Sequence, residues 1–267
     1  MILASATPLN LALALGAAAA YAISAAGTQR LDLRWVNLAV WVAWILHGAL
    51  LVIGLWGPES RFGFAPALSL TVWLVGLVYA IEGYVYPQFK KPWLTSGFGS
   101  ASVLLALLFP GASLNANASP WLPLHFALGI SSYGLFAIAV AHAWLMTQAE
   151  ARIRSASDAM TGMPILTMER LTFRFVTVGF VLLSATLLAG LLFGGQLYGG
   201  SNALRWNHKT IFAFLSWLTF AVLLVGRSHF GWRGKRAVRV LYTGAGLLLL
   251  AYVGSRFVME VVLGLTL

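Results

Sequence analysis

The stretch LHFALGISSYGLFAIAVAHAWL, residues 124–145, contains no Asp, Glu, Lys or Arg. An α-helix needs about 20 apolar residues to cross the hydrocarbon core of a bilayer, and an uncharged stretch of this length is typical of such a span. The rest of the chain has the same character, with 60% hydrophobic and only 9% charged residues. The sequence therefore predicts an integral membrane protein.

Further apolar stretches, bounded by charged or turn-forming residues, lie on either side of this one. Together the predicted spans are 9–26, 35–57, 63–85, 93–111, 121–147, 171–193, 208–226 and 238–264. They leave no room for a separate soluble domain. We therefore expect an all-α, polytopic membrane helix bundle with eight transmembrane helices, and residues 1–267 forming a single integral membrane domain.

The basic residues indicate the orientation of this bundle. Of the 17 Lys and Arg residues, thirteen fall in or at the edges of the odd-numbered connections between predicted spans, three in or at the edges of the even-numbered ones, and Arg256 inside the last span. Because basic residues are held on the cytoplasmic side, we expect the odd connections in the cytoplasm and both termini outside. This placement also accounts for the net charge of +10, so we expect the lipid bilayer as the partner of the chain, and no nucleic acid.

Two connections stand out from the rest. The fifth, from about 148 to 170, is the longest and is expected to be a surface linker. The sixth contains two pairs of glycines, at 194–195 and 199–200. Paired glycines allow tight turns or the close approach of a ligand, so we expect either a ligand-covering loop or a plain flexible turn.

Few residue types remain to carry chemistry. Cysteine is absent, which excludes disulfides, thiolate metal sites and covalent haem attachment within this chain. The motifs of serine hydrolases, zinc proteases and phosphate-binding loops are also absent from the sequence. We therefore expect a protein that is not an enzyme, and turn to its five histidines.

Two histidines are expected near the same membrane face. His125 lies at the outer end of the fifth predicted span, and His208 at the outer start of the seventh. A neutral imidazole is the usual axial ligand of haem iron, so this pair is a candidate site for iron held between two helices. The alternative is an interfacial hydrogen bond to a neighbouring carbonyl for His125, and a polar helix-start residue for His208.

Residues beside His208 complete the candidate haem site. Lys209 and Arg205 are expected to pair with the haem propionates, and Trp206 to supply a flat apolar surface. Three further aromatic residues are expected at this depth: Trp121, Phe193 and Tyr198. Aromatic residues also form the ordinary belt at membrane interfaces, so they discriminate poorly.

The other polar residues inside predicted spans are interpreted as architecture. His47 and His142 are compatible with a haem or proton path, but we favour histidines that hydrogen-bond across helices. Arg256 and Glu260 are four residues apart on one helical face and are expected to neutralise each other. Glu82, near the inner end of its span, is expected to reach the cytoplasmic interface.

Three stretches in the second half resemble the cytochrome c assembly family, the haem-handling membrane proteins typified by the CcsA-type subunit of system II cytochrome c maturation. They are residues 124–145, quoted above, WNHKTIFAFLSWLTFAVLLVGR at 206–227 and GWRGKRAV at 231–238, in the family's order. The resemblance is strongest over residues 121–264. It implies haem handling in the bacterial inner membrane, with His125 matching a haem ligand of the family.

The chain also departs from the family pattern. Haem-exporting members carry a tryptophan-rich, Asp-containing segment before the lysine, whereas QLYGGSNALRWNHK at 196–209 has one tryptophan and no acidic residue. Val225 replaces an expected histidine, and no histidine follows Leu265. His208 falls where the family usually has proline, so its ligand role rests on the residues and not on the resemblance. The pattern resembles the short, HemX-like branch.

The sequence thus leads to two function classes. The first is a non-enzymatic, multi-pass protein of cytochrome c assembly or haem handling that binds haem b near the periplasmic face of the bacterial inner membrane. The second is a membrane partner or regulatory subunit that kept the fold but lost haem binding, with other membrane protein subunits as partners. A small-ion or metabolite transporter is less well supported, because no inverted repeat is apparent.

Overall fold

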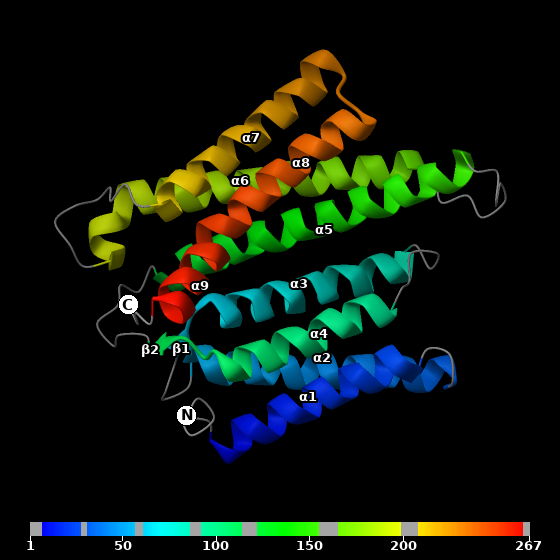
Figure 1. The fold of residues 1–267 in the computed structure, drawn as a ribbon, viewed down its shortest axis with the longest axis vertical. Coiled ribbons are helices and arrows are strands. Elements are labelled where there is room, and N and C mark those ends of the chain that lie inside the picture. The colour runs from blue at the N-terminus through cyan, green and yellow to red at the C-terminus, as the bar shows by residue number, and fades with distance from the viewer. Residues whose placement is uncertain are drawn as a thin grey trace. The chain divides into compact units, whose positions relative to one another are not determined.

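The computed structural model describes residues 7–27, 31–56, 61–85, 92–113, 122–154, 165–198 and 208–263 (Figure 1). In this part of the chain the long helices are α1 (Pro8–Gly27), α2 (Leu33–Trp56), α3 (Phe64–Val85), α4 (Pro92–Leu108), α5 (Leu122–Arg154), α6 (Ile165–Tyr198), α7 (His208–Phe230) and α8 (Gly234–Leu249). The last helix continues through the π-helical turn η3 (Leu250–Gly254), then α9 (Ser255–Phe257) and the π-helical turn η4 (Val258–Val262). Two short strands, β1 (Arg61–Phe62) and β2 (Ala112–Ser113), pair antiparallel.

The all-helical, multi-pass class is confirmed, and each predicted span coincides with a helix. Within the described residues, seven helices are long and apolar enough to cross a membrane. The remaining one, α4, has 17 residues, about 26 Å at 1.5 Å per residue, which is less than the roughly 30 Å of the hydrocarbon core. The count of eight spans is therefore not confirmed, and the position of the termini outside stays a prediction.

Two predicted connections are wrong in their extent. The helix α5 continues to Arg154 and α6 begins at Ile165, so most of the expected linker 148–170 is helical. Gly194 and Gly195 also lie within α6, which ends at Tyr198, so this glycine pair does not form a turn. Hydropathy marks only the part of a helix inside the hydrocarbon core, and these helices run on into polar sequence. Gly199 and Gly200 lie outside the described residues.

The chain packs as two compact units. Unit 1 comprises Met1–Ala116 and Arg256–Leu267, and unit 2 comprises Asn117–Ser255. The expectation of a single integral membrane domain, residues 1–267, stays a prediction, and each unit is described by itself below.

Unit 1 is built on close helix packing against α1. Three alanines of this helix, Ala14, Ala17 and Ala18, are buried, and their small side chains let neighbouring backbones approach closely. At one end of the unit, Gly111 has a φ of +80°, and a Cβ there would lie 2.5 Å from the carbonyl oxygen of Phe62. Only glycine fits this position, which brings β2 against β1.

Unit 2 is held together by aromatic rings set between four helices. The helices α5 and α6 run side by side, with α7 and α8 against them (Figure 1). The rings of Phe136 on α5 and Phe220 on α7 stack with their centroids 3.7 Å apart. Gly244 on α8 gives Phe220 its space, because a Cβ there would lie 2.8 Å from the ring. The Ser216 hydroxyl donates to the Gly244 carbonyl at 2.8 Å and ties α7 to α8.

Candidate functional site

His125 lies in the first turn of α5, half-buried against α6. Its neighbour there is Gly190, and a Cβ added to that glycine would lie 3.6 Å from Cε1 of the imidazole. The imidazole therefore occupies space that a side chain at position 190 would enter. The ring therefore lies at the start of α5 and beside α6, about two turns before α6 ends.

Lys209, the second residue of α7, lies close enough to His125 to act on it electrostatically. Its ammonium nitrogen is also 5.1 Å from the ring centroid of Tyr252 in η3. The Tyr252 ring in turn makes an edge contact with Tyr133 of α5, with centroids 6.4 Å apart. A cation over an aromatic face is attracted by the ring quadrupole, so these contacts fix Lys209 among three helices.

We call His125, Tyr133, Gly190, Lys209 and Tyr252 the His125 cluster. It combines a nitrogen that can bind a metal, a cation for an anionic group and flat aromatic surface, at one end of unit 2. His125 and Lys209 are recognisable in the sequence, whereas the two tyrosines are not, since tyrosines in apolar spans carry no motif. Tyr252 lies in a π-helical turn, a feature frequent at functional sites and not readable from this sequence.

The remaining residues of the expected haem site are placed only in part. His208 begins α7 and is exposed, next in the chain to Lys209. Arg205 and Trp206 lie outside the described residues, as do Trp121 and the side chains of Phe193 and Tyr198. It therefore stays a prediction that His208 and His125 bind the same haem iron.

His47 and His142, which lie well inside helices, are buried. In unit 1, Nε2 of His47 lies 2.7 Å from the Ser69 hydroxyl and Nδ1 lies 3.4 Å from the Tyr21 hydroxyl. His47 is thus bonded across three helices, as the favoured interpretation predicts. In unit 2, His142 is buried, with the edge of its ring toward Phe175. No group of three or more His, Cys, Asp or Glu residues that could hold a metal ion occurs in the described part of the chain.

Three charged residues inside predicted spans have side chains outside the described part of the structure, so their expected roles stay predictions. These are Glu82, Arg256 and Glu260, whose backbones lie in α3, α9 and η4.

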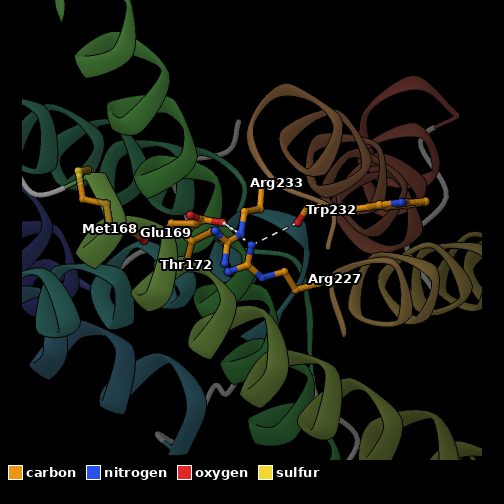
Figure 2. A network of polar contacts seen from close by, with 6 residues as sticks. All are labelled: Met168, Glu169, Thr172, Arg227, Trp232 and Arg233. Atoms are coloured by element: carbon orange, nitrogen blue, oxygen red, sulfur yellow. Dashed lines mark hydrogen bonds and ion pairs between the residues drawn. The ribbon is translucent and has the colours of Figure 1, made fainter. Parts of the chain in front are cut away.

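A second polar centre, missed by the sequence analysis, lies at the junction of α6, α7 and the turn before α8. Figure 2 shows Arg227 and Arg233 converging on the Glu169 carboxylate. Arg227 Nη1 donates to Glu169 Oε1 and, at 3.3 Å, to the Trp232 carbonyl, while Arg233 Nε lies 3.6 Å from Glu169 Oε1. This centre is not expected from the sequence, because Glu169 falls in the predicted linker 148–170.

Glu169 and its partners connect α6, α7 and the turn before α8. The side chain of Glu169 is 10% exposed and that of Arg227 is 24% exposed, so the pair is largely shielded from water. The guanidinium of Arg227 also lies over the Phe173 ring, 4.5 Å from its centroid. The contacts join the end of α7 to the first turns of α6. We call Glu169, Arg227, Trp232 and Arg233 the Glu169 clamp.

Comparison with known proteins identifies the relatives of this chain. The family model described as "Cytochrome C assembly protein" matches residues 9–263. The inner membrane protein YpjD of Escherichia coli K12 is 28% identical over 214 residues, which cover 77% of this chain and 79% of that protein. The cytochrome c biogenesis protein CcsA of Prochlorococcus marinus is 38% identical over 52 residues, 20% of this chain and 16% of that protein. No solved structure matches the chain.

Proposed function

The chain belongs to the cytochrome c assembly protein family, and from this membership we propose that it is a non-enzymatic inner-membrane protein that handles haem for cytochrome c assembly. The family match spans nearly the whole multi-pass chain. The E. coli relative YpjD is an inner membrane protein, which supports the location in the inner membrane. Haem handling is supported by the His125 cluster, and the convergence of His125, Gly190 and Lys209 is the observation that carries the proposal.

The residues of the His125 cluster fit a haem cargo. An imidazole nitrogen of His125 would bind the iron, and Gly190 keeps the space beside the ring clear of a side chain. The Lys209 ammonium would pair with a propionate, and Tyr252 offers flat aromatic surface. His208 as a second ligand, with Arg205 and Trp206 as further contacts to haem b, belongs to the same proposal.

The proposal is tested by purifying the full chain with haem supplied and recording its Soret spectrum. We expect a b-type signal in the wild type and its loss in His125→Ala. The matched control is His229→Ala, which removes an exposed histidine at the end of α7 and should keep the signal. A haem-free wild type, or an unchanged spectrum in His125→Ala, would contradict the assignment.

A second candidate function is a membrane partner or regulatory subunit that no longer binds haem. One observation favours it: residues 196–209 hold one tryptophan and no acidic residue, where haem-exporting relatives are expected to carry a tryptophan-rich, acidic segment. The same purification distinguishes the two. Haem-free preparations that retain a stoichiometric membrane protein partner would support this second function.

A further inference from the structure

The exposed face of α8 changes from basic to apolar along its length. Its exposed residues begin with Lys235, Arg236 and Arg239 and continue, beyond Tyr242, to Leu249, followed by the exposed Leu250 of η3. The opposite face is buried in unit 2 through Ala237, Leu241, Gly244 and Leu248. Residues Gly234–Gly254 form a candidate membrane span. The three basic residues therefore lie on the outward face of a spanning helix, within its first two turns, where lipid headgroups are expected.

The helix α6 repeats this arrangement. Arg170 and Arg174 are exposed and lie one helical turn apart. The same side of α6 continues with Val178 and Val181, which are 51% and 60% exposed. A long basic side chain at such a position places its stem along apolar surface and its charge among headgroups.

The Glu169 clamp brings these two basic faces to the same end of unit 2. Arg233, directly before α8, reaches Glu169, the neighbour of Arg170 on α6 (Figure 2). Arg227 also binds Glu169, so this carboxylate already has two cationic partners. In the described part of the chain, no ion pair with a carboxylate is formed by Arg170, Arg174, Lys235, Arg236 or Arg239. The surface therefore keeps a surplus of positive charge.

We propose that the exposed basic faces of α6 and α8, joined by the Glu169 clamp, bind the phosphate groups of anionic phospholipids. We call this the α6–α8 basic surface, made of Arg170, Arg174, Lys235, Arg236 and Arg239. Anionic headgroups supply the complementary charge, and each nearby Lys or Arg strengthens such binding. The continuation of both faces into exposed apolar residues favours lipid over an acidic protein segment. Phe230, 73% exposed, ends α7 directly before the turn to α8, and exposed aromatic residues are common at membrane interfaces.

The test uses native mass spectrometry of the full chain in detergent with equal amounts of phosphatidylglycerol and phosphatidylcholine. We expect the wild type to retain phosphatidylglycerol in preference. The variant Lys235→Gln/Arg239→Gln should reduce that preference about thirtyfold, because two surface charges are lost. The matched control Arg34→Gln/Arg61→Gln removes two charges from unit 1 and should behave as wild type.

Two further measurements distinguish lipid binding from binding of free phosphate and from loss of folding. The charge-conserving variant Lys235→Arg/Arg239→Lys should keep the lipid preference, and circular dichroism should show equal helicity in all variants. Millimolar inorganic phosphate should not displace the lipid. Equal retention of both lipids by the wild type, an unchanged preference in the glutamine variant, or displacement by phosphate would overturn the proposal. Copurification of an acidic protein that depends on Lys235 and Arg239, without lipid preference, would overturn it as well. None of these outcomes bears on haem binding.

Discussion

Unit 1 places neutral buried polar groups against one another, whereas unit 2 places charged groups at the ends of its helices. In unit 1, His47 bonds to Ser69 and Tyr21, and the hydroxyls of Ser24 and Ser96 lie 3.1 Å apart. The rings of Trp44 and Trp73 stack, and each indole donates to the other residue's carbonyl, at 3.2 and 2.9 Å. The hydrogen-bonding capacity of these groups is met within unit 1 without a ligand. We therefore interpret them as structural contacts that hold the helices of unit 1 together.

In unit 2 the polar groups involve charge. The Glu169 clamp joins three segments at one place, and the His125 cluster places Lys209 against an aromatic ring at another. Ionisable groups within membrane proteins are costly and mark functional sites by default. Burial of a histidine alone therefore does not mark a site: His47 is more deeply buried than His125, and both of its ring nitrogens have hydroxyl partners.

The largest effect is expected from Glu169→Ala. This change leaves the shielded Arg227 without its carboxylate, which should lower the free energy of unfolding by about 3 kcal/mol. Denaturant titration in detergent micelles measures it. The control Arg233→Gln removes a side chain that is 66% exposed and should cost less than about 1 kcal/mol. Equal losses in the two variants would mean that burial of the ion pair is not the source of the stability.

The second-largest effect on stability is expected from His47→Ala, which is compared with His125→Ala. His47→Ala leaves the buried hydroxyls of Tyr21 and Ser69 without their partner and should lower the free energy of unfolding by about 2 kcal/mol. Its haem content should equal that of the wild type. His125→Ala should show the reverse, with a smaller loss of stability and no Soret signal. Loss of haem in a folded His47→Ala protein would place unit 1 in the site as well.

Much of the fold could be predicted from the sequence, because hydropathy and helix length are local properties. The helices α2 and α3 form close to the expected bounds, and the family resemblance is confirmed by the match over residues 9–263. The end of α5 and the start of α6 could not be predicted in this way, because charged residues in those turns interrupt the apolar pattern.

Only those site residues could be predicted whose side chain alone suggests a role, such as metal binding or positive charge. His125 and Lys209 stand out as a possible iron ligand and a cation in an apolar chain. Tyr252 comes close to Lys209 only through the packing of the last helix on α7, a contact between residues 43 positions apart that no local pattern encodes. Glu169 and Arg227 are separated by 58 positions, and the clamp exists only because α6 begins before Glu169.

A smaller effect is expected from Gly226→Ala, which tests how tightly Trp232, in the turn between α7 and α8, packs against α7. A Cβ at Gly226 would lie 2.3 Å from the Trp232 ring, so Gly226→Ala must displace that ring. We expect a net loss of about 1 kcal/mol, because overpacking costs about 2 and alanine regains about 1 in a helix. In Gly246→Ala, where nothing lies within 4 Å, only the gain should remain. Thermal unfolding of both variants measures the difference, and a stabilised Gly226→Ala would show that Trp232 moves at no cost.

The smallest effect concerns a charged pair in unit 1 that serves as the reference for the Glu169 clamp. Arg34 Nη2 lies 3.5 Å from Asp32 Oδ2, and the two side chains are 76% and 71% exposed. Water and salt screen such a pair, and ordering two exposed side chains offsets most of the attraction, so Arg34→Gln should change the free energy of unfolding by less than about 0.5 kcal/mol. The effect should vanish in 0.5 M NaCl, whereas the loss caused by Glu169→Ala should persist, because the ions of the shielded pair are less accessible to salt. Denaturant titrations of both variants at low and high salt measure this. A loss in Arg34→Gln as large as that in Glu169→Ala would mean that shielding from water does not distinguish the charges of unit 2 from those of unit 1.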